Sequence, residues 1–376
     1  MTHLILVGVM VVALPSLGLS AAASTGTTSK LPRTAGAHAS PNAVKVLRYL
    51  CRLPRKEDTR VLSGQNLGCA NLDVAQGYAT YFGKLEELTG KLPALVGVDY
   101  GSEDMVPAKI SETNKILIRH WNQGGLVTIS MSPRNPWTGG GLRDLSLGNA
   151  TYGDAVKNGT DANKRLRVCL DIVAAGLSEL RDAGVVVLWR PFHEMNGDFF
   201  WWSAGHDGGR ATSDDFRALW KYLFDYFTTT HRLNNLLWVY APNAPVNSAI
   251  KPVTYYYPGD AYVDVVGLDY YANTLDALNA GGGYDALLSL GKPCGLTEVG
   301  PAFWWKAHPS GTFDNTLIIR DIRSKYPGIV FFLYWHGWSS LLMDVKMGIV
   351  ENRNAAGLLN DPWVITLDEV DRGAVK

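Results

Sequence analysis

This chain of 376 residues carries no excess charge of either sign, because its 35 Lys and Arg residues balance its 35 Asp and Glu residues. A protein without a net field has little to attract nucleic acid or an anionic membrane surface, so neither is an expected partner. Hydrophobic residues make up 47% of the sequence and charged residues 19%, which permits a large buried core and argues against wholesale disorder.

Several motifs of common protein classes are missing. The four Cys residues have neither the CxxC nor the CxxH spacing of a structural zinc site. His193-Glu194 lacks the second His of HExxH, and no GxSxG occurs, which disfavours a metallopeptidase and an esterase. Cys51 and Cys69 are close enough in sequence to form a disulfide, but the sequence does not fix the pairing of the four Cys residues.

The apolar run Leu4–Leu19 is too short to span a membrane comfortably, and the small residues Ala21–Ala23 follow it. This pattern is typical of a secretory signal peptide. We therefore expect residues 1–23 to be a signal peptide removed near Ala23, residues 24–40 to be a disordered tether, and the mature protein to be secreted without stable membrane insertion. A membrane anchor is the alternative, because the positive charge before the run is weak.

Past about residue 40 the sequence contains no linker, repeat or low-complexity stretch. Eight short aliphatic or β-branched runs alternate there with longer segments of helical periodicity, such as 165–183 and 216–228. This alternation predicts an α/β fold, a (β/α)8 TIM barrel, as a single catalytic domain over residues 41–376. An open doubly wound sheet is the alternative, but no glycine-rich nucleotide loop follows any run. The runs are Val61–Ser63, Leu95–Val98, Leu126–Met131, Val185–Arg190, Leu236–Tyr240, Val263–Leu268, Cys294–Glu298 and Val330–Trp335.

Polar residues lie at or just after the ends of several runs. In a (β/α)8 barrel these positions surround one mouth, which is where the chemistry takes place. A single polar residue there could merely cap a strand, whereas a ring of them indicates a site. The ring contains Gln65, Asn66, Asp99, Tyr100, Arg190, Tyr240, Asp269, Tyr270, Tyr271, Glu298, Trp335 and His336.

Two glutamates stand out at this mouth. Glu194 follows the fourth run and Glu298 closes the seventh, so the barrel places them across the mouth from each other. Glycoside cleavage needs such a pair, one acid to protonate the leaving oxygen and one carboxylate to attack or stabilise the anomeric carbon. Arg190 could keep the attacking carboxylate ionised, and His193 could position it or a sugar hydroxyl. A structural histidine or a salt-bridged surface glutamate is the alternative for each residue taken alone.

The segment 189–202, WRPFHEMNGDFFWW, resembles the signature of glycoside hydrolase family 26, a family dominated by endo-β-1,4-mannanases. Shorter segments resemble the family in the same order along the chain, so the resemblance extends from about residue 41 to the C-terminus. These segments are Val61–Gln65, Val96–Tyr100, Gly267–Tyr271, Thr297–Gly300, Phe331–Trp335 and Asn360–Thr366.

The resemblance implies a retaining endo-β-1,4-mannanase that needs neither a metal nor an organic cofactor. Glu194 matches the family's acid/base and Glu298 its nucleophile. His193 matches a histidine that contacts the sugar in the −1 subsite. Tyr271 matches a tyrosine that hydrogen-bonds the nucleophile, although the adjacent Tyr270 is an alternative.

Further residues are expected to bind substrate. Trp335 matches the family's tryptophan platform under the −1 sugar, and Arg190, Asn196 and Trp202 lie in or next to the signature. Asn196, like His193, could hydrogen-bond the axial 2-hydroxyl of mannose.

Two positions depart from the family. Phe199 stands where a Trp is usual, so stacking at the +1 subsite is expected to differ. Met131-Ser132 stand where the third strand usually ends in Trp-His, so one contact on the −1 side is not predicted. The expected partner is mannan or glucomannan, bound by a monomer. A lichenase or xylanase on the same scaffold, or a sugar-binding protein that has lost turnover, are the alternatives.

Overall fold

The computed structural model describes residues 33–55, 59–72, 74–203, 211–245, 247, 249–302, 310–339 and 344–376. The predicted signal peptide and the first part of the predicted tether lie outside these ranges. Within them, no helix combines the length and the apolar character needed to cross a membrane.

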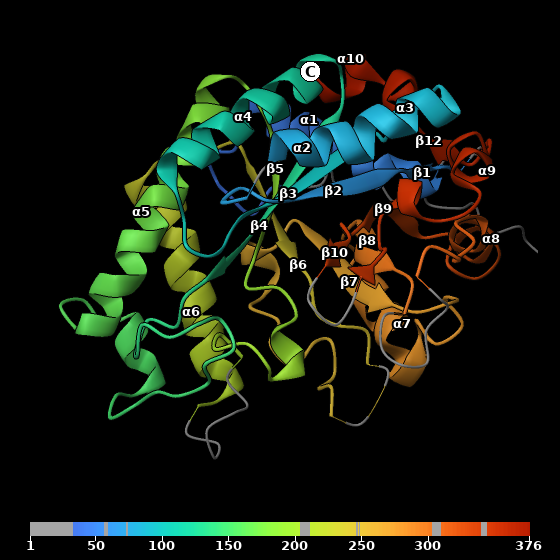
Figure 1. The fold of residues 1–376 in the computed structure, drawn as a ribbon. Helices are drawn as coiled ribbons and strands as arrows, with labels where there is room; N and C mark the ends of the chain where they lie inside the picture. Colours follow the sequence, from blue (N-terminus) through green and yellow to red (C-terminus); the bar gives the residue numbers. More distant parts are fainter. Residues whose placement is uncertain are drawn as a thin grey trace, which may run out of the picture. The chain divides into compact units, whose positions relative to one another are not determined.

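Eight parallel strands close into a barrel at the centre of the fold (Figure 1). The ring runs from β2 to β9 in sequence order, and β9 closes it by pairing with both β8 and β2. Seven of the eight predicted runs overlap one of these strands and the first, Val61–Ser63, ends directly before β2, so the predicted (β/α)8 barrel is confirmed. The strands are β2 Gly64–Cys69, β3 Leu95–Glu103, β4 Leu126–Pro133, β5 Val187–Pro191, β6 Leu236–Tyr240, β7 Val265–Tyr271, β8 Cys294–Gly300 and β9 Ile329–Tyr334.

The first run forms a short strand of its own. β1, Val61–Leu62, precedes β2 and pairs with β9 and with β12, Val364–Ile365. β10, Trp338–Ser339, and β11, Asp344–Val345, form a separate antiparallel pair.

Helices surround the barrel, because each carries one apolar face that must be buried against the strands. Helix α5 begins at the N-cap Thr160, whose side chain accepts a hydrogen bond from Asn163 N, and buries a row of leucines and alanines. The helices are α1 Pro41–Arg52, α2 Val74–Tyr78, α3 Lys84–Thr89, α4 Pro107–Asn122, α5 Asp161–Asp182, α6 Ser213–Asp225, α7 Gly283–Leu288, α8 Thr316–Lys325, α9 Ala355–Leu359 and α10 Arg372–Val375.

The barrel interior is packed by the strands' own side chains. All residues of β5, β6, β8 and β9 are buried. Gly295 leaves room for a large ring, since a Cβ at this position would come within 2.3 Å of Phe331 Cζ. Such packing fixes the strands, and with them the residues at their carboxyl ends.

The last part of the predicted tether contacts the barrel. Ala35 N donates a hydrogen bond to Asp264 Oδ1 at 2.6 Å, and Ser40 N donates to Asn234 O at 2.7 Å. The Ser40 side chain also caps α1. From Ala35 onward, therefore, this segment is held by the barrel.

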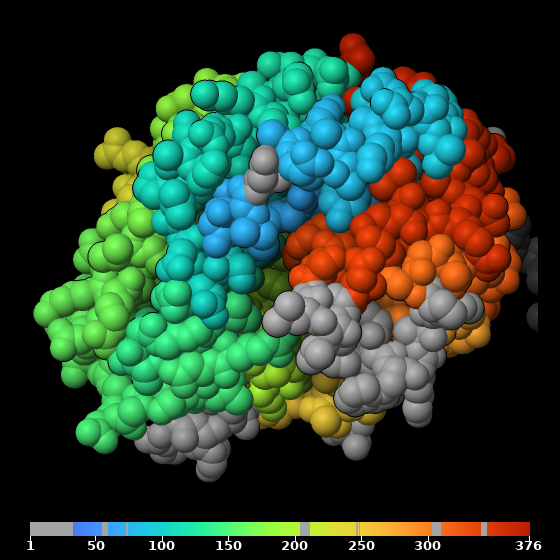
Figure 2. Space-filling model, in the orientation of Figure 1, coloured from blue at the N-terminus to red at the C-terminus, as the bar shows by residue number. Residues whose placement is uncertain are grey.

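None of the four Cys residues, all in the described part of the chain, forms a disulfide. The bridge that the sequence allowed between Cys51 and Cys69 is therefore not present. Figure 2 shows that the surface is hollowed between the blue to green segments and the red C-terminal segment.

Candidate active site

Strands β5, β7 and β8 bring one cation and two carboxylates together at the barrel mouth. Arg190 lies in β5 next to its end, Asp269 lies in β7, and Glu298 lies in β8 with its Cα paired to that of Asp269. The guanidinium bridges the two acids, from Nη1 to Asp269 Oδ2 at 3.0 Å and from Nη2 to Glu298 Oε1 at 2.6 Å. All three side chains are buried.

Glu298 receives hydrogen bonds on both of its oxygens. Arg190 binds Oε1, and the Tyr271 hydroxyl donates to Oε2. Of the two adjacent tyrosines considered from the sequence, it is thus Tyr271 whose hydroxyl binds the glutamate. Charge-assisted hydrogen bonds of this kind stabilise the ionised form of a carboxyl group.

Asp269 is the member of this cluster that the sequence did not single out. Burial and the neighbouring charge of Glu298 raise the pKa of Asp269 well above its usual range, although Arg190 opposes the shift. The sequence signals for it were its place in the ring of polar residues at the strand ends and in the segment Gly267–Tyr271. Asp269 therefore competes with Glu298 for the single positive charge of Arg190.

Glu194 lies in a turn directly after β5, with φ 55° and ψ 25°. This left-handed conformation is unfavourable for a residue with a Cβ, and Phe192 and Asp198 share it. The Glu194 side chain is half-buried, and the described residues give its carboxyl group no hydrogen bond. Burial, with the charge of Glu298, raises the pKa of Glu194 to about 8, although Arg190 and Arg143 oppose the shift.

The two glutamates are close enough to act on one bond. One carboxylate oxygen each of Glu194, Asp269 and Glu298 lie within 4.8 Å of one another. Three carboxylates at this spacing could in principle hold a metal ion. The Arg190 guanidinium already bridges two of them, however, so a cation would face a fixed positive charge, and the donor set fits a metal poorly.

His193 lies between the nucleophile candidate and an aromatic cluster. Its Nε2 is 3.7 Å from Glu298 Oε1, and its ring packs against Phe200 and Trp202 with centroids 5.6 and 5.9 Å away. Burial and the charge of Arg190 hold the pKa of His193 well below its usual range. His193 is therefore neutral, with one ring nitrogen able to donate and one able to accept.

Two residues predicted to bind substrate are instead part of the support beneath the site. Trp202 is fully buried, and its Nε1 donates to His193 O at 2.8 Å. Asn196 is also fully buried; its amide nitrogen donates to the carbonyl oxygens of Asn243 and Lys251, and its Oδ1 accepts from Asn243 N. Neither side chain is exposed, and both bind backbone groups of the protein.

Arg190 is buried as well, and its hydrogen bonds to Asp269 and Glu298 give it the role of holding the nucleophile candidate rather than a sugar. Trp335 remains half-buried beside this cluster, where Arg190 Cζ lies 5.8 Å from the centroid of its ring. Its backbone N donates to Val299 O at 3.0 Å, which holds the backbone of Trp335 next to β8.

The structure gives the contacts of the two positions that depart from the family pattern. Met131 is fully buried, and the Ser132 hydroxyl donates to Asp99 Oδ2 at 2.9 Å. Phe199 is half-buried, and Arg143 Cζ lies 5.5 Å from the centroid of its ring. A cation thus lies over the aromatic ring of Phe199.

Glycoside hydrolysis requires two carboxyl groups of unlike protonation facing one bond, and a (β/α)8 barrel presents them at its mouth. Fold and site together define the chain as a glycoside hydrolase. It belongs to glycosyl hydrolase family 26, whose model matches residues 36–369. The family resemblance noted in the sequence is confirmed.

Relatives with known names are similar over most of the chain. A mannan endo-1,4-beta-mannosidase of Bacillus subtilis is 35% identical over 347 residues, 89% of this chain and 89% of that protein. Mannan endo-1,4-beta-mannosidase A and B of Caldalkalibacillus mannanilyticus is 36% identical over 343 residues, 89% of this chain and 63% of that protein. The solved structure of a Bacillus subtilis mannanase matches with a TM-score of 0.73 at 32% identity, covering 89% of this chain and 94% of that one.

Proposed function

We propose that this glycoside hydrolase is a secreted, retaining endo-β-1,4-mannanase that hydrolyses mannan or glucomannan by double displacement. The names of its relatives support the substrate. The observation that supports the mechanism is the contrast between the two glutamates, because Glu298 accepts hydrogen bonds from Arg190 and Tyr271 whereas burial keeps Glu194 protonated.

In the first step a carboxylate oxygen of Glu298 attacks the anomeric carbon. As that C–O bond forms, the glycosidic C–O bond breaks and the proton of Glu194 passes to the leaving oxygen. The product is a glycosyl-enzyme ester with Glu194 ionised. Oxygens within 4.8 Å of each other fit this chemistry, because retaining enzymes hold the two carboxyl groups about 5–5.5 Å apart and inverting enzymes roughly 6.5–9.5 Å apart.

In the second step Glu194 removes a proton from water, and the water oxygen attacks the anomeric carbon. The ester bond to Glu298 breaks, Glu194 is protonated again, and the sugar leaves with its original anomeric configuration. Proton transfers of this kind contribute roughly 10²–10⁴-fold to the rate.

Substrate choice must come from polar contacts, since the flat ring of Trp335 would accept any β-linked pyranose. Mannose carries an axial 2-hydroxyl beside the reacting carbon, and a hydrogen bond to it can strengthen in the transition state. We assign this contact to His193, whose Nε2 lies 3.7 Å from Glu298 Oε1. His193→Ala should therefore reduce mannan cleavage by about 10²-fold or less without abolishing it.

A substrate panel tests the assignment. Purified enzyme is incubated with mannan, glucomannan, lichenan and xylan, with Glu298→Ala as the inactive control, and reducing ends are measured. We expect hydrolysis of mannan or glucomannan to be at least about tenfold faster than that of the other two, a margin of about 1.4 kcal/mol. Equal rates on all four polymers would overturn the mannanase assignment.

Two further measurements address the mechanism and the location. Proton NMR of early products should show the β-anomer first, and early release of the α-anomer would exclude retention. Mass spectrometry of protein recovered from the medium should show a start near Ser24, and an intact Met1 there would exclude the signal peptide.

A further inference from the structure

The turn that carries Glu194 has a backbone conformation that the turn alone does not favour. Phe192, Glu194 and Asp198 all have φ between 50° and 55°, although none of them is glycine. Residues with a Cβ adopt this region only where surrounding contacts impose it. The contacts that hold Glu194 therefore decide where its carboxyl group points.

Both backbone polar groups of Glu194 are bound by one short segment, Ala241–Ala244, which directly follows β6. Glu194 N donates to Ala241 O at 2.8 Å, and the side-chain amide of Asn243 donates to Glu194 O at 3.3 Å. Glu194 O also accepts from Gly197 N at 3.0 Å, within the turn itself. The segment after β6 thus clamps the peptide groups on both sides of the Glu194 Cα.

Asn243 is in turn fixed by Asn196, which lies in the same turn as Glu194. Asn243 N donates to Asn196 Oδ1 at 2.7 Å, and Asn196 Nδ2 donates to Asn243 O at 3.0 Å and to Lys251 O at 2.9 Å. Lys251 N returns a hydrogen bond to Asn196 O at 3.0 Å. This reciprocal pair locks the two loops together through a fully buried amide.

The same segment reaches the nucleophile side of the site. Asn243 forms a parallel bridge with Asp269, Asp269 N donates to Pro242 O at 3.0 Å, and Ala244 N donates to Asp269 O at 3.1 Å. Asp269 binds the Arg190 guanidinium that holds Glu298. One stretch of four residues therefore sets the position of Glu194 relative to Glu298.

We propose that Asn243 is a positioning residue for the acid/base: its side-chain amide and its pairing with Asn196 hold Glu194 in the conformation that aims the carboxyl group at the leaving oxygen. The inference rests on the proposed function, because it assigns Asn243 to the step in which Glu194 donates its proton. A residue that acts through the acid/base matters most when the leaving group needs protonation, and this dependence separates positioning from a merely structural role.

The test compares two substrates of the wild type and of Asn243→Ala. Mannohexaose has a sugar leaving group that needs a proton, and a 2,4-dinitrophenyl β-mannobioside has one that does not. We expect kcat/KM of Asn243→Ala to fall about 10–100-fold on mannohexaose and to stay within about threefold on the aryl glycoside. Asn243→Ser, which keeps a polar side chain at this half-buried position, gives the same comparison if the alanine variant does not fold.

Asn235→Ala is the matched control. Asn235 lies before the other end of β6, is buried, and donates its amide to Val185 O at 3.1 Å, far along the strand from the mouth. This variant should lower thermal stability and change both substrates equally. Equal losses on the two substrates by Asn243→Ala, or no loss on either, would overturn the inference.

Glu194→Ala in the same assay separates a failure of the acid/base assignment from a failure of the role proposed for Asn243. If Glu194→Ala spares the aryl glycoside and Asn243→Ala does not, the acid/base assignment stands and only the role of Asn243 fails. If Glu194→Ala loses both substrates alike, the proposed function fails, and the inference fails with it.

Discussion

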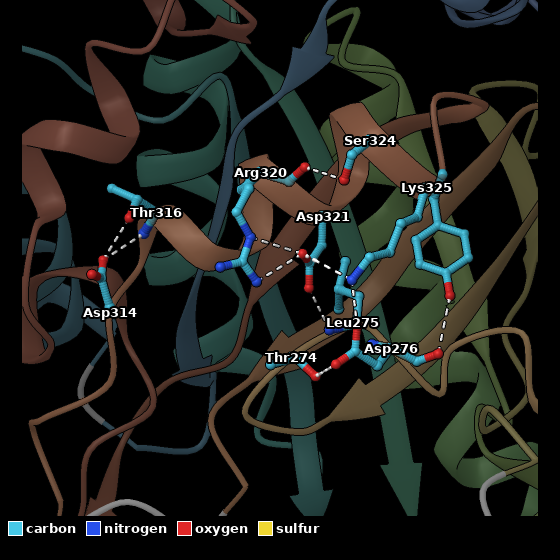
Figure 3. A network of polar contacts seen from close by, with 10 residues as sticks. Thr274, Leu275, Asp276, Asp314, Thr316, Arg320, Asp321, Ser324 and Lys325 are labelled. Atoms are coloured by element: carbon cyan, nitrogen blue, oxygen red, sulfur yellow. Dashed lines mark hydrogen bonds and ion pairs between the residues drawn. The ribbon is translucent and has the colours of Figure 1, made fainter.

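Two clusters of carboxylates and cations hold loops of this barrel, and they differ in whether their cations are exposed to water. At the mouth, Arg190, Asp269 and Glu298 are all excluded from solvent, with side chains at most 5% exposed. On α8, Asp321 is equally buried, but the side chains of its partners Arg320 and Lys325 are 54% and 39% exposed (Figure 3).

In the α8 cluster a single carboxylate, that of Asp321, accepts hydrogen bonds from three residues. Asp321 Oδ2 accepts from Leu275 N at 2.9 Å, which anchors the loop that follows β7, and Oδ1 accepts from Arg320 and Lys325. Lys325 also pairs with Asp276 of that loop. Burial acts to raise the pKa of Asp321, but these hydrogen bonds outweigh it and the pKa is lowered.

The mouth cluster is arranged the other way. One guanidinium serves two carboxylates, a third lies nearby, and the pKa values of Asp269 and Glu194 are raised because of burial and the charge of Glu298. At α8, where two solvent-exposed cations surround Asp321, these groups stabilise a loop. At the mouth, where one buried cation serves several carboxylates, they leave Glu194 protonated, which is what a proton donor needs.

The largest effect is expected from Arg190→Met, which keeps the volume but removes the shared charge. Asp269 and Glu298 would then be buried without a cation, and losing one partner of a buried pair costs about 3–5 kcal/mol. We expect kcat/KM on mannan to fall at least about 10³-fold, with a lower Tm. Arg320→Met on α8 is the matched change and should cost about 1 kcal/mol or less, with normal kinetics. Comparable losses in the two variants would erase the distinction between the clusters.

Tyr271→Phe removes one hydrogen bond from the Glu298 carboxylate and leaves the ring in place. A donor aimed at a reacting group is worth on the order of 10²-fold in kcat, and we expect a loss of about that size with little change in Tm. Tyr270→Phe is the control, because neighbouring residues of a strand face opposite ways. Its kcat should match the wild type; a larger loss in Tyr270→Phe than in Tyr271→Phe would contradict the site geometry.

Asp321→Asn should show that the α8 cluster acts on stability alone. We expect the free energy of unfolding at pH 7 to fall by about 1–3 kcal/mol while kcat is unchanged, as measured by urea titration and kinetics. Because the folded-state pKa of Asp321 is lowered, its stabilisation is present above the unfolded pKa of about 3.9 and is lost as pH falls below it. A difference from the wild type that persisted at pH 2 would argue against this charge effect.

The smallest effect is expected from Arg143→Ala, and it concerns the pH profile. Glu194 must be protonated to act, so activity is lost as pH rises through its pKa of about 8. Glu298, Asp269, Tyr271 and Arg190 also face this carboxyl group. Arg190 and Arg143 both favour its ionised form, and of the two Arg143 is the exposed one, on the loop after β4.

Removing Arg143 should therefore move the alkaline limb of kcat/KM to higher pH, by less than about one unit and less at high salt. Arg134→Ala is the control, since that exposed arginine of the same loop pairs with Asp104 and should leave the limb unmoved. A shift to lower pH in Arg143→Ala would show that its charge does not act on Glu194.

The barrel could be predicted from the sequence because strands buried on both faces leave continuous apolar runs, and each run became a strand. The facing of Glu194 and Glu298 followed from the same pattern, since strand ends meet at one mouth. These inferences depend on periodicity and on strand order, and both are local properties of the sequence.

What the sequence could not show was the direction of side chains around the turn after β5. Asn196 and Trp202 are close to Glu194 in the chain, but the left-handed residues Glu194 and Asp198 redirect the backbone and turn both side chains inward. Asp269 was missed for a related reason, because its raised pKa depends on its burial and on the charge of Glu298, and its ion pair is with Arg190, which is 79 residues away. Contacts of that range leave no local pattern.

The pairing of β1 with β12 has a consequence for how the barrel is made. Ser63 and Ile365 share hydrogen bonds across a sequence separation of 302 residues, and Val61 and Leu62 pair directly with Val364 and Ile365. Loop closure over such a span is slow, so β1 lies early in the chain but its edge is covered only when β12 pairs with it. A chain growing from its N-terminus would therefore keep this edge open until Val364 and Ile365 have been synthesised.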